Sequence, residues 1–322
     1  MIDPLENRLL QLYHDYPKTK PSRRKWFLDT CLKNFERICN LVDGERQDLA
    51  AIIFDSMEAS NWKIKAVEKA IARSMRAKAK ITTELTDACI PAIIGSVARF
   101  EAEPGGDIDL DFVIDEEFVN LTDARSQLKD VLASVNEILR KMQPKDNIIF
   151  QLSRLRDVEF YGMTEVSDLD KPDHLSNLLI GAYPVIGEKR FNKCVLNAKQ
   201  KIKKKIVLKE LKKRIEEDLT KRRREPVKVG YTVLNYVLRM LALNYLKCED
   251  VDKNYWRICE LLEGKINQDF LSDLAIQARS IIYVRRRTDR KDEVRSFVEK
   301  KILLNAKHIF DELCLVKAKE LA

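Results

Sequence analysis

Histidine and paired cysteine are scarce in this chain, and their scarcity argues against several kinds of active site. The chain has 322 residues but only three histidines, which lie far apart at His14, His174 and His308. A histidine-based catalytic triad or a histidine metal cage therefore has little support. The seven cysteines are scattered, odd in number and without a C-x-x-C pair. This pattern argues against a zinc site and favours reduced thiols, as in a cytoplasmic compartment.

Long apolar runs and the common nucleotide-cofactor motifs are missing as well. The first residues are acidic and polar, and no apolar stretch has the length of a membrane span. We therefore expect a soluble, cytoplasmic protein with no membrane partner. No G-x-G-x-x-G turn follows a predicted strand and no G-x-x-x-x-G-K-S/T loop occurs. Dinucleotide and P-loop cradles of the usual kind are thereby excluded.

The composition is that of a globular chain with a basic balance. Apolar residues make up 45% of the chain, enough for a large core and two or three structural units. We predict an α+β protein with a helical region over 1–85, a small mixed β-sheet core over 86–190 and a helical domain over 191–322. The net charge of +8 suits an anionic partner such as a nucleotide or nucleic acid, without identifying one.

Two β-branched, apolar segments flank a loop in the central region. Cys89–Ile94 and Ile108–Ile114 are predicted to be buried strands, and the Pro-Gly-Gly sequence between them is typical of a loop. Gly95 follows the first strand, and its missing Cβ lets the backbone approach a ligand closely. Ser96 offers a hydroxyl and a backbone N–H to a phosphate oxygen. A Gly-Ser pair by itself is weak evidence for such a loop.

Two acids stand where the second strand begins. Asp107 and Asp109 are one residue apart, so on a strand their side chains leave the same face with about 6.5–7 Å between Cα atoms. Mg²⁺ is usually held by one or two carboxylates together with substrate phosphates, and a pair of ions can serve both reacting oxygens. We expect Asp111, on the same face, to be solvated or to support the ligands rather than to bind metal. The simpler alternative is that all three form the polar face of an edge strand.

Taken together, Gly95-Ser96, Arg99 and Asp107-x-Asp109 resemble the G-S-x-x-R-G-x(6)-D-x-D signature of the polymerase-β-like nucleotidyltransferase superfamily. Glu101, two places after the arginine, makes the chain most similar to PII-protein uridylyltransferases and to relatives of these that lack regulatory domains.

The chain also departs from the family pattern. Phe100 and Gly106 stand where the family usually has Gly and Ser, and neither change replaces a metal ligand. A later G-G-L-R element lacks its arginine near Tyr231.

The resemblance implies a Mg²⁺-dependent enzyme, with two metal ions expected. It would transfer a nucleoside monophosphate from a nucleoside triphosphate such as ATP to an acceptor, with release of pyrophosphate. Asp107 and Asp109 would hold the metal ions, Gly95 and Ser96 the phosphates, and Arg99 the loop or a phosphate. We favour a protein or small-molecule acceptor. The alternatives are an RNA-directed enzyme that acts on tRNA or adds tails, and an inactive nucleotide-binding regulatory module.

The resemblance also implies a third carboxylate on a neighbouring strand, where it would serve a metal ion and the attacking hydroxyl. Leu155–Tyr161 is the segment that we predict to supply it. As a strand it would turn Val158 and Phe160 to the core and place Asp157 and Glu159 on the opposite face. Either acid fits, and we favour Glu159 slightly.

Helical periodicity dominates the remainder of the chain. Ser60 is predicted to cap a helix with a buried stripe at Ile64, Val67, Ile71 and Met75. A further helix is predicted over 123–142, with Leu128, Val131, Leu132, Val135, Ile138 and Leu139 buried. The family resemblance also implies a helical region after the catalytic core that includes residues 266–285.

Two basic segments allow more than one interpretation. Residues 199–224 are predicted to form one long amphipathic helix rich in Lys and Arg. It could be a track for RNA, but we favour a solvated face with interleaved acids. Arg285-Arg286-Arg287 with Arg290 could grip a triphosphate or could simply complement a helix dipole, and neither interpretation is preferred.

Overall fold

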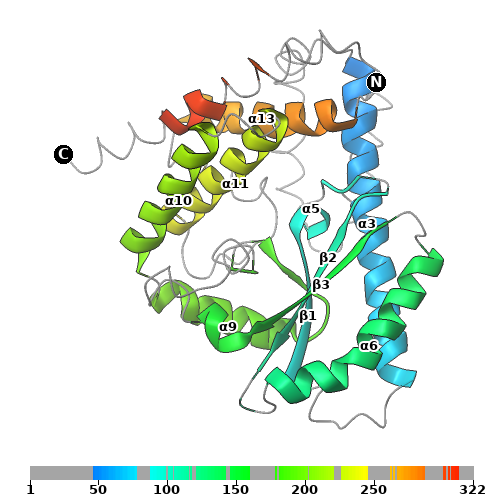
Figure 1. Cartoon of the computed structure of the whole chain (residues 1–322). Coiled ribbons are helices and arrows are strands. Elements are labelled where there is room, and N and C mark those ends of the chain that lie inside the picture. The colour runs from blue at the N-terminus through cyan, green and yellow to red at the C-terminus, as the bar shows by residue number, and fades with distance from the viewer. Residues whose placement is uncertain are drawn as a thin grey trace. The chain divides into compact units, whose positions relative to one another are not determined.

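The computed structural model shows a mixed α+β chain in which a small sheet is accompanied by helices (Figure 1). Among the helices described, none is both long and apolar enough to cross a membrane. The structure describes residues 46–77, 88–98, 101–103, 105–115, 117, 121–142, 146–159, 178–179, 181–201, 203–220, 226–245, 262, 264, 267–286 and short pieces between 300 and 311.

The chain divides into two compact units. One contains residues 56–206 and therefore the whole sheet. The other contains residues 207–246 together with the described residues after 255. This division assigns residues 56–77 of the helix over 46–77, and the helix after residue 188, to the same unit as the sheet, whereas the sequence suggested boundaries at residues 85 and 190.

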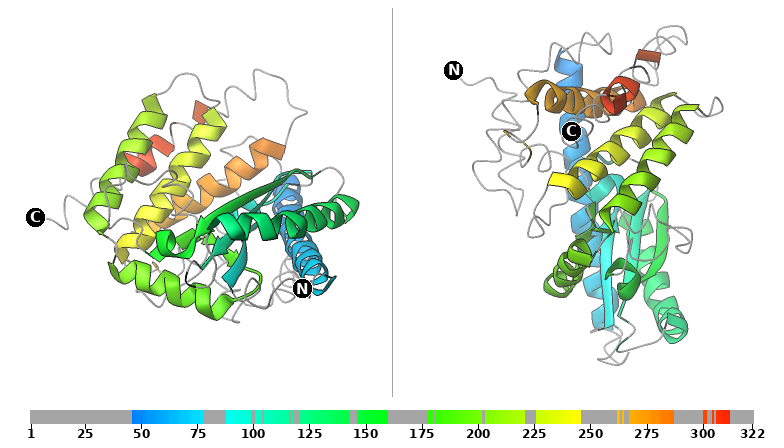
Figure 2. Two further views of the ribbon diagram at one scale, coloured as in Figure 1. Left: turned by 60° about the horizontal axis from the view of Figure 1, so that its bottom comes forward. Right: turned by 90° about the vertical axis from the view of Figure 1, so that its left-hand side faces the viewer.

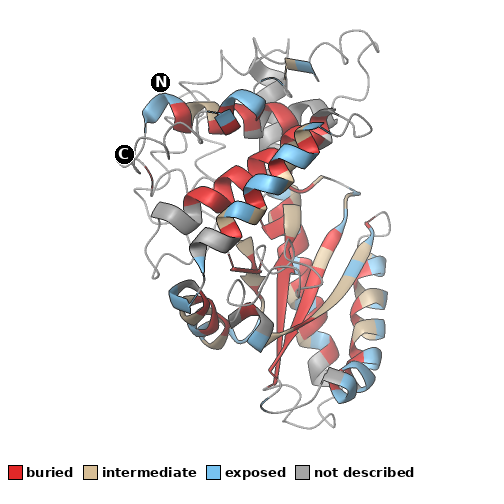
Figure 3. Ribbon diagram, turned by 60° about the vertical axis from the view of Figure 1, so that its left-hand side comes forward, coloured by how far each residue is buried: buried red, intermediate tan, exposed pale blue. Residues whose placement is uncertain are grey.

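The sheet has four strands in the order β3-β2-β1-β4. They are β1 (Cys89–Ile94), β2 (Ile108–Ile114), β3 (Ile148–Arg154) and β4 (Tyr183–Pro184). β1 is antiparallel to β2 and β4, whereas β2 and β3 are parallel and are connected through helix α6 (Leu121–Met142). The bounds predicted for the first two strands are confirmed. Both are buried along almost their whole length, while β3 is largely half-buried (Figure 3).

The two faces of the sheet have different partners. Tyr183 pairs with Ile93, which pairs with Leu110, so these three side chains share one face. The Tyr183 hydroxyl donates to Glu68 Oε1 at 3.0 Å, which places helix α3 (Arg46–Ala77) on that face. α6 lies beside α3, as the hydrogen bond from the Ser74 to the Ser134 hydroxyl shows (Figure 1). The opposite face of β2, with Asp109 and Asp111, is directed the other way.

The helix around Ser60 is confirmed, but its predicted start is wrong. α3 begins at Arg46, so Ser60 lies in its middle and is fully buried. The predicted stripe is buried at Ile64, Val67 and Ile71, and the side chain of Met75 lies outside the described set.

The helix predicted over 123–142 is confirmed as α6. Its buried positions include Leu128, Val131, Val135 and Leu139, while Leu132 and Ile138 are only half-buried.

The prediction of one helix over 199–224 is wrong. α9 (Glu188–Lys201) ends and α10 (Lys204–Thr220) begins within a run of lysines. A continuous helix would bring Lys199 next to Lys203 and Lys201 next to Lys205 at i,i+4 spacing, where like charges repel. The break lets each helix bury its own apolar face, with Phe191 and Val195 on α9 and Leu211 and Ile215 on α10.

The second unit is helical where it is described. α10 and α11 (Pro226–Tyr245) run alongside each other in every view, and α11 packs against α13 (Gln268–Arg286) (Figure 2). Asn267 caps α13, because its side-chain oxygen accepts the Asp269 N–H at 2.8 Å. The helix predicted over 266–285 is confirmed.

Candidate functional site

Gly95 and Asp109 lie against each other where β1 ends and β2 begins. Ile94 pairs with Asp109 across the two strands, and the chain turns at Gly95 with a φ of 71°. A Cβ at Gly95 would overlap with Asp109 Oδ2 and lie 3.3 Å from Asp109 Cγ. Only glycine fits this position, because a side chain would be strained by the positive φ and would also displace the carboxylate. Gly95 of the predicted phosphate loop therefore lies next to the side chain of Asp109, a predicted metal ligand.

The loop after Gly95 is closed by its own backbone. The Glu101 N–H donates to the Ser96 carbonyl at 2.9 Å, and the Gly106 N–H donates to the Glu103 carbonyl at 3.0 Å. Gly105 takes a positive φ of 75° in the second of these turns. The loop thus holds Ser96 at the end of β1 and delivers Asp107 to the start of β2. Arg99 and Phe100 lie outside the described residues.

The site can be reached by a ligand. Asp107 is exposed, and Gly95, Ser96 and Asp109 are half-exposed. Among the described residues, no group of three or more His, Cys, Asp or Glu side chains converges on one point. Two hard carboxylate ligands fit Mg²⁺, which takes much of its coordination from water and substrate phosphates. The residues present therefore fit a divalent cation that binds together with a triphosphate.

Two side chains of helix α3 form hydrogen bonds with the backbone of the loop. The Ser60 hydroxyl accepts the Ala102 N–H at 3.0 Å and donates to the Ser56 carbonyl at 2.7 Å. Lys63 Nζ donates to the Gly106 carbonyl at 2.8 Å and forms an ion pair with Asp146 at 3.1 Å.

Sequence reasoning missed the contacts of Lys63. One signal could have revealed them: Lys63 is a charged residue within the stripe of buried positions of α3.

Asp111 differs from the two acids before it. It is completely buried, and its Oδ2 accepts a hydrogen bond from the Ser153 hydroxyl at 2.7 Å. The expectation that Asp111 is solvated is therefore wrong, whereas its second expected role, supporting the ligands, stays a prediction. Asp111 continues the line of acids into the interior of the sheet unit.

Cys89 and an ion pair lie at the far end of the same strands. Burial, reinforced by the nearby negative charge of Asp111 and partly offset by Arg190, raises the pKa of the Cys89 thiol to about 12. Arg190 forms an ion pair with Asp115, which follows β2. Cys89 is therefore a neutral, inert thiol at physiological pH.

The segment predicted to carry the third carboxylate is a helix, so the strand prediction is wrong. Leu155–Glu159 forms α7, and the side chains of Asp157 and Glu159 are not among those described. β2 and β3 are parallel, with Ile108 opposite Ile148 and Ile114 opposite Arg154. α7 therefore follows the end of β3 remote from Asp109, about 20 Å away along the strand.

β3 itself offers no substitute for this carboxylate. The residue opposite Asp109 is Ile149, and β3 contains no acid. Leu155 instead connects α7 to α9, because its carbonyl accepts the Cys194 thiol at 3.4 Å.

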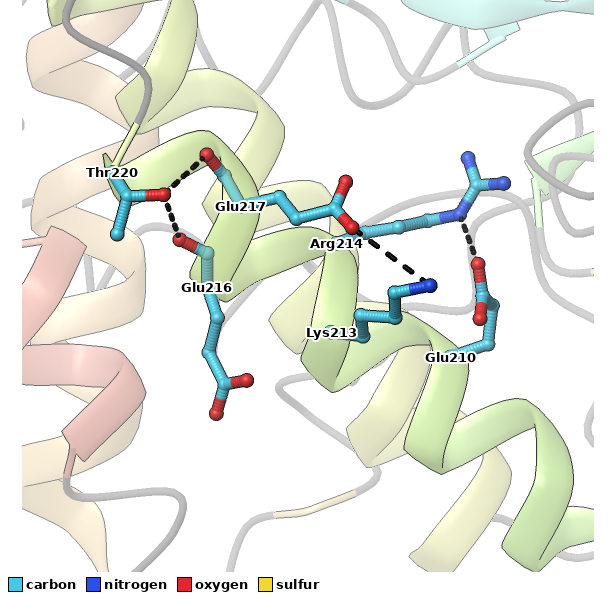
Figure 4. Close-up of polar contacts among 6 residues, drawn as sticks. All are labelled: Glu210, Lys213, Arg214, Glu216, Glu217 and Thr220. Carbon is cyan, nitrogen blue, oxygen red and sulfur yellow. Dashed lines mark hydrogen bonds and ion pairs between the residues drawn. The ribbon is translucent and has the colours of Figure 1, made fainter.

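The charges of α10 are largely balanced within the helix itself. Arg214 pairs with Glu210 at 3.1 Å, and Lys213 lies 3.9 Å from Glu217 (Figure 4). Lys212 lies 3.8 Å from Glu216. All three pairs have i,i+4 spacing, as on a solvated face. The side chains of Arg285 and Arg286 are not among those described, and Arg287 and Arg290 lie outside the described residues.

Comparison with known proteins adds no relative. No protein-family model matches the chain, and no curated protein matches it.

Proposed function

We propose that the protein is a Mg²⁺-dependent nucleotidyltransferase of the polymerase-β-like kind, in which 86–190 is the catalytic core. It transfers a nucleoside monophosphate from a nucleoside triphosphate to an acceptor and releases pyrophosphate. One observation carries the proposal: the glycine of the Gly-Ser loop lies directly against the carboxylate of Asp109. The nucleotidyl-transfer signature requires this juxtaposition, and the two elements are separated by a loop in the sequence.

Each residue of the candidate site has a distinct part in this reaction. Ser96 binds the terminal phosphates through its hydroxyl and backbone N–H, and Gly95 lets them approach. Asp107 and Asp109 hold Mg²⁺, which when bound neutralises the leaving pyrophosphate and lowers the pKa of the attacking group. The loop is already closed by the Glu101 to Ser96 hydrogen bond, so the site contributes mainly by positioning.

We propose this function without Asp157 or Glu159. α7 lies at the opposite end of β3 from Asp109, so neither acid has support as a third ligand. The substrate phosphates and water complete the coordination instead.

We propose a protein or a small molecule as the acceptor. The acids interleaved on α10 favour this choice over RNA, because they reduce the net positive charge that a phosphate backbone would meet.

Pyrophosphate release provides the test of the proposed function. The purified chain is incubated with Mg²⁺, cell lysate and each α-³²P-labelled nucleoside triphosphate in turn, and labelled macromolecules and metabolites are separated. We expect label on one acceptor and stoichiometric pyrophosphate, both abolished by Asp107→Ala with Asp109→Ala. Glu103→Ala, in the same loop but outside the site, serves as the matched control. Turnover that survives the double substitution would reject the function.

A further inference from the structure

Lys63 is the only charged residue on α3 that the structure describes as buried. Its side chain is 1% exposed and that of its partner Asp146 is 2% exposed. Removing two charges from water is unfavourable, and an apolar pair of similar size would often serve a core equally well. The contacts of Lys63 and Asp146 therefore indicate a role for these two charges beyond filling the core.

Lys63 connects two segments that enter the sheet side by side. Its Nζ binds the carbonyl of Gly106, which directly precedes Asp107, and the carboxylate of Asp146, which lies just before β3. Between these contacts, the Ile108 N–H donates to the Asn147 carbonyl at 2.8 Å. The ammonium thus fixes the starts of β2 and β3 at one point. We call Lys63, Asp146 and the Gly106 carbonyl the Lys63 bridge.

The Lys63 bridge acts on the candidate site through the main chain. The Gly106 carbonyl belongs to the peptide unit that leads into Asp107, so holding it restricts the backbone from which Asp107 projects. Asp109 is fixed independently from the opposite side by β1 pairing and by Gly95. The spacing of the two carboxylates therefore depends on the Lys63 bridge at one end and on Gly95 at the other.

We propose that Lys63 is a positioning residue for a divalent-cation site formed by Asp107 and Asp109. This inference rests on the proposed function, in which these two acids hold the metal. Lys63 contacts neither metal nor substrate. It fixes the loop that presents the two ligands, as residues behind a metal site often do.

Removal of both charges of the bridge separates this role from simple core packing. Lys63→Met alone leaves Asp146 buried without its partner, so the variant of choice is Lys63→Met with Asp146→Asn. Mn²⁺ binding is measured by electron paramagnetic resonance, and folding by thermal melting. We expect the dissociation constant for Mn²⁺ to rise about tenfold while the variant remains folded at the assay temperature. Lys65→Met, which removes an exposed lysine of α3, should bind Mn²⁺ like the unmodified chain.

Each outcome of this experiment decides the proposal. Unchanged Mn²⁺ affinity in a folded double variant would overturn it. A double variant that is unfolded at the assay temperature would show that the pair serves the fold itself, and would also overturn it.

The Mn²⁺ titration also distinguishes this inference from the proposed function. The unmodified chain is compared with Asp107→Asn plus Asp109→Asn, which should remove the binding. If Mn²⁺ binds at these acids and no pyrophosphate is released, the proposed function fails while the role of Lys63 is still decided by the double variant. If no Mn²⁺ binds at these acids even with a nucleoside triphosphate present, both proposals fall.

Discussion

Asp109 and Asp111 stand on the same face of the same strand, yet their surroundings are opposite. Asp109 is half-exposed and lies against Gly95, at the open end of β2. Asp111, one step further along that face, is completely buried and accepts a hydrogen bond from Ser153. Residue type and spacing are identical for the two acids. Their neighbours make one accessible to a ligand and turn the other into part of the interior.

The same contrast extends to the regions around the two acids. Beside Asp109, the loop holds its shape through backbone hydrogen bonds and two positive-φ glycines, which leaves the carboxylate accessible. Beside Asp111, the space is closed by the neighbouring strand, where Ser153 is buried and donates its hydroxyl hydrogen to the carboxylate. We expect substitutions in the open region to affect activity and those in the closed region to affect stability.

The largest difference in turnover should be the one between Asp109→Asn and Asp111→Asn. Asp109→Asn should lower pyrophosphate release by about 1000-fold, because a ligand charge acting on the transition state is lost, while the melting temperature stays close to that of the unmodified chain. Asp111→Asn should retain most of its turnover wherever the protein is folded. Turnover and thermal melting are measured on both. Equal losses of turnover in two folded variants would show that Asp111 also works in the site.

Gly95→Ala should have the second-largest effect, a loss of turnover. Its Cβ must displace the carboxylate of Asp109, and a misplacement of about 1 Å costs on the order of 100-fold in rate. Gly264→Ala is the matched control, because Gly264 has a similar positive φ of 76° but nothing within 4 Å of a Cβ. Both variants carry the backbone strain, and only Gly95→Ala should lose turnover at saturating triphosphate. A similar loss in the two would mean that strain alone is responsible.

Ser153→Ala tests the closed region. The variant removes the donor to Asp111 Oδ2, so we expect the free energy of unfolding to fall by about 1–3 kcal/mol. Urea denaturation measures the change. Ser126→Ala, on the exposed face of α6, should change it by less than about 0.5 kcal/mol. Unchanged stability in Ser153→Ala would mean that this hydrogen bond does not hold the closed region together.

Cys89 should have the smallest effect, a contribution to the free energy of unfolding that depends on pH. Its pKa is raised from 9.0 to about 12 in the folded chain, so the folded state retains a proton that the unfolded state loses. This contribution is fully present below pH 9 and is lost as the pH rises toward 12. Between pH 8 and pH 10 it amounts to about 1 kcal/mol.

Cys89→Val, compared with the unmodified chain by urea denaturation at both pH values, isolates the contribution of the thiol. The variant should lose less stability over this interval than the unmodified chain does. Parallel losses would mean that the thiol titrates normally.

The part of the candidate site that lies between two adjacent strands could be predicted from the sequence. β1 and β2 consist of β-branched and apolar residues, and Pro-Gly-Gly separates them. Because neighbouring antiparallel strands joined by a short loop pair with each other, the strand bounds bring Gly95 to Asp109. A local pattern is enough when the contact itself is local.

The third carboxylate could not be predicted in this way. Leu155–Glu159 is too short for its periodicity to separate a strand from a helix, since Val158 is apolar at the right position for either. Its helical state depends on packing against α9, which lies further along the chain. The prediction of a helix cap at Ser60 failed for a related reason. A serine that caps a helix and a buried serine that hydrogen-bonds a loop cannot be told apart in the sequence.

The hairpin of β1 and β2 has a consequence for how this protein assembles. Gly95, Ser96, Asp107 and Asp109 all lie on one short segment, and the pairing of β1 with β2 closes only a small loop. β3 and β4 join later in the sequence and require much longer closures, which are slower. We therefore expect the backbone around Asp107 to reach its final geometry only when Asp146 and Asn147 come to lie beside β2.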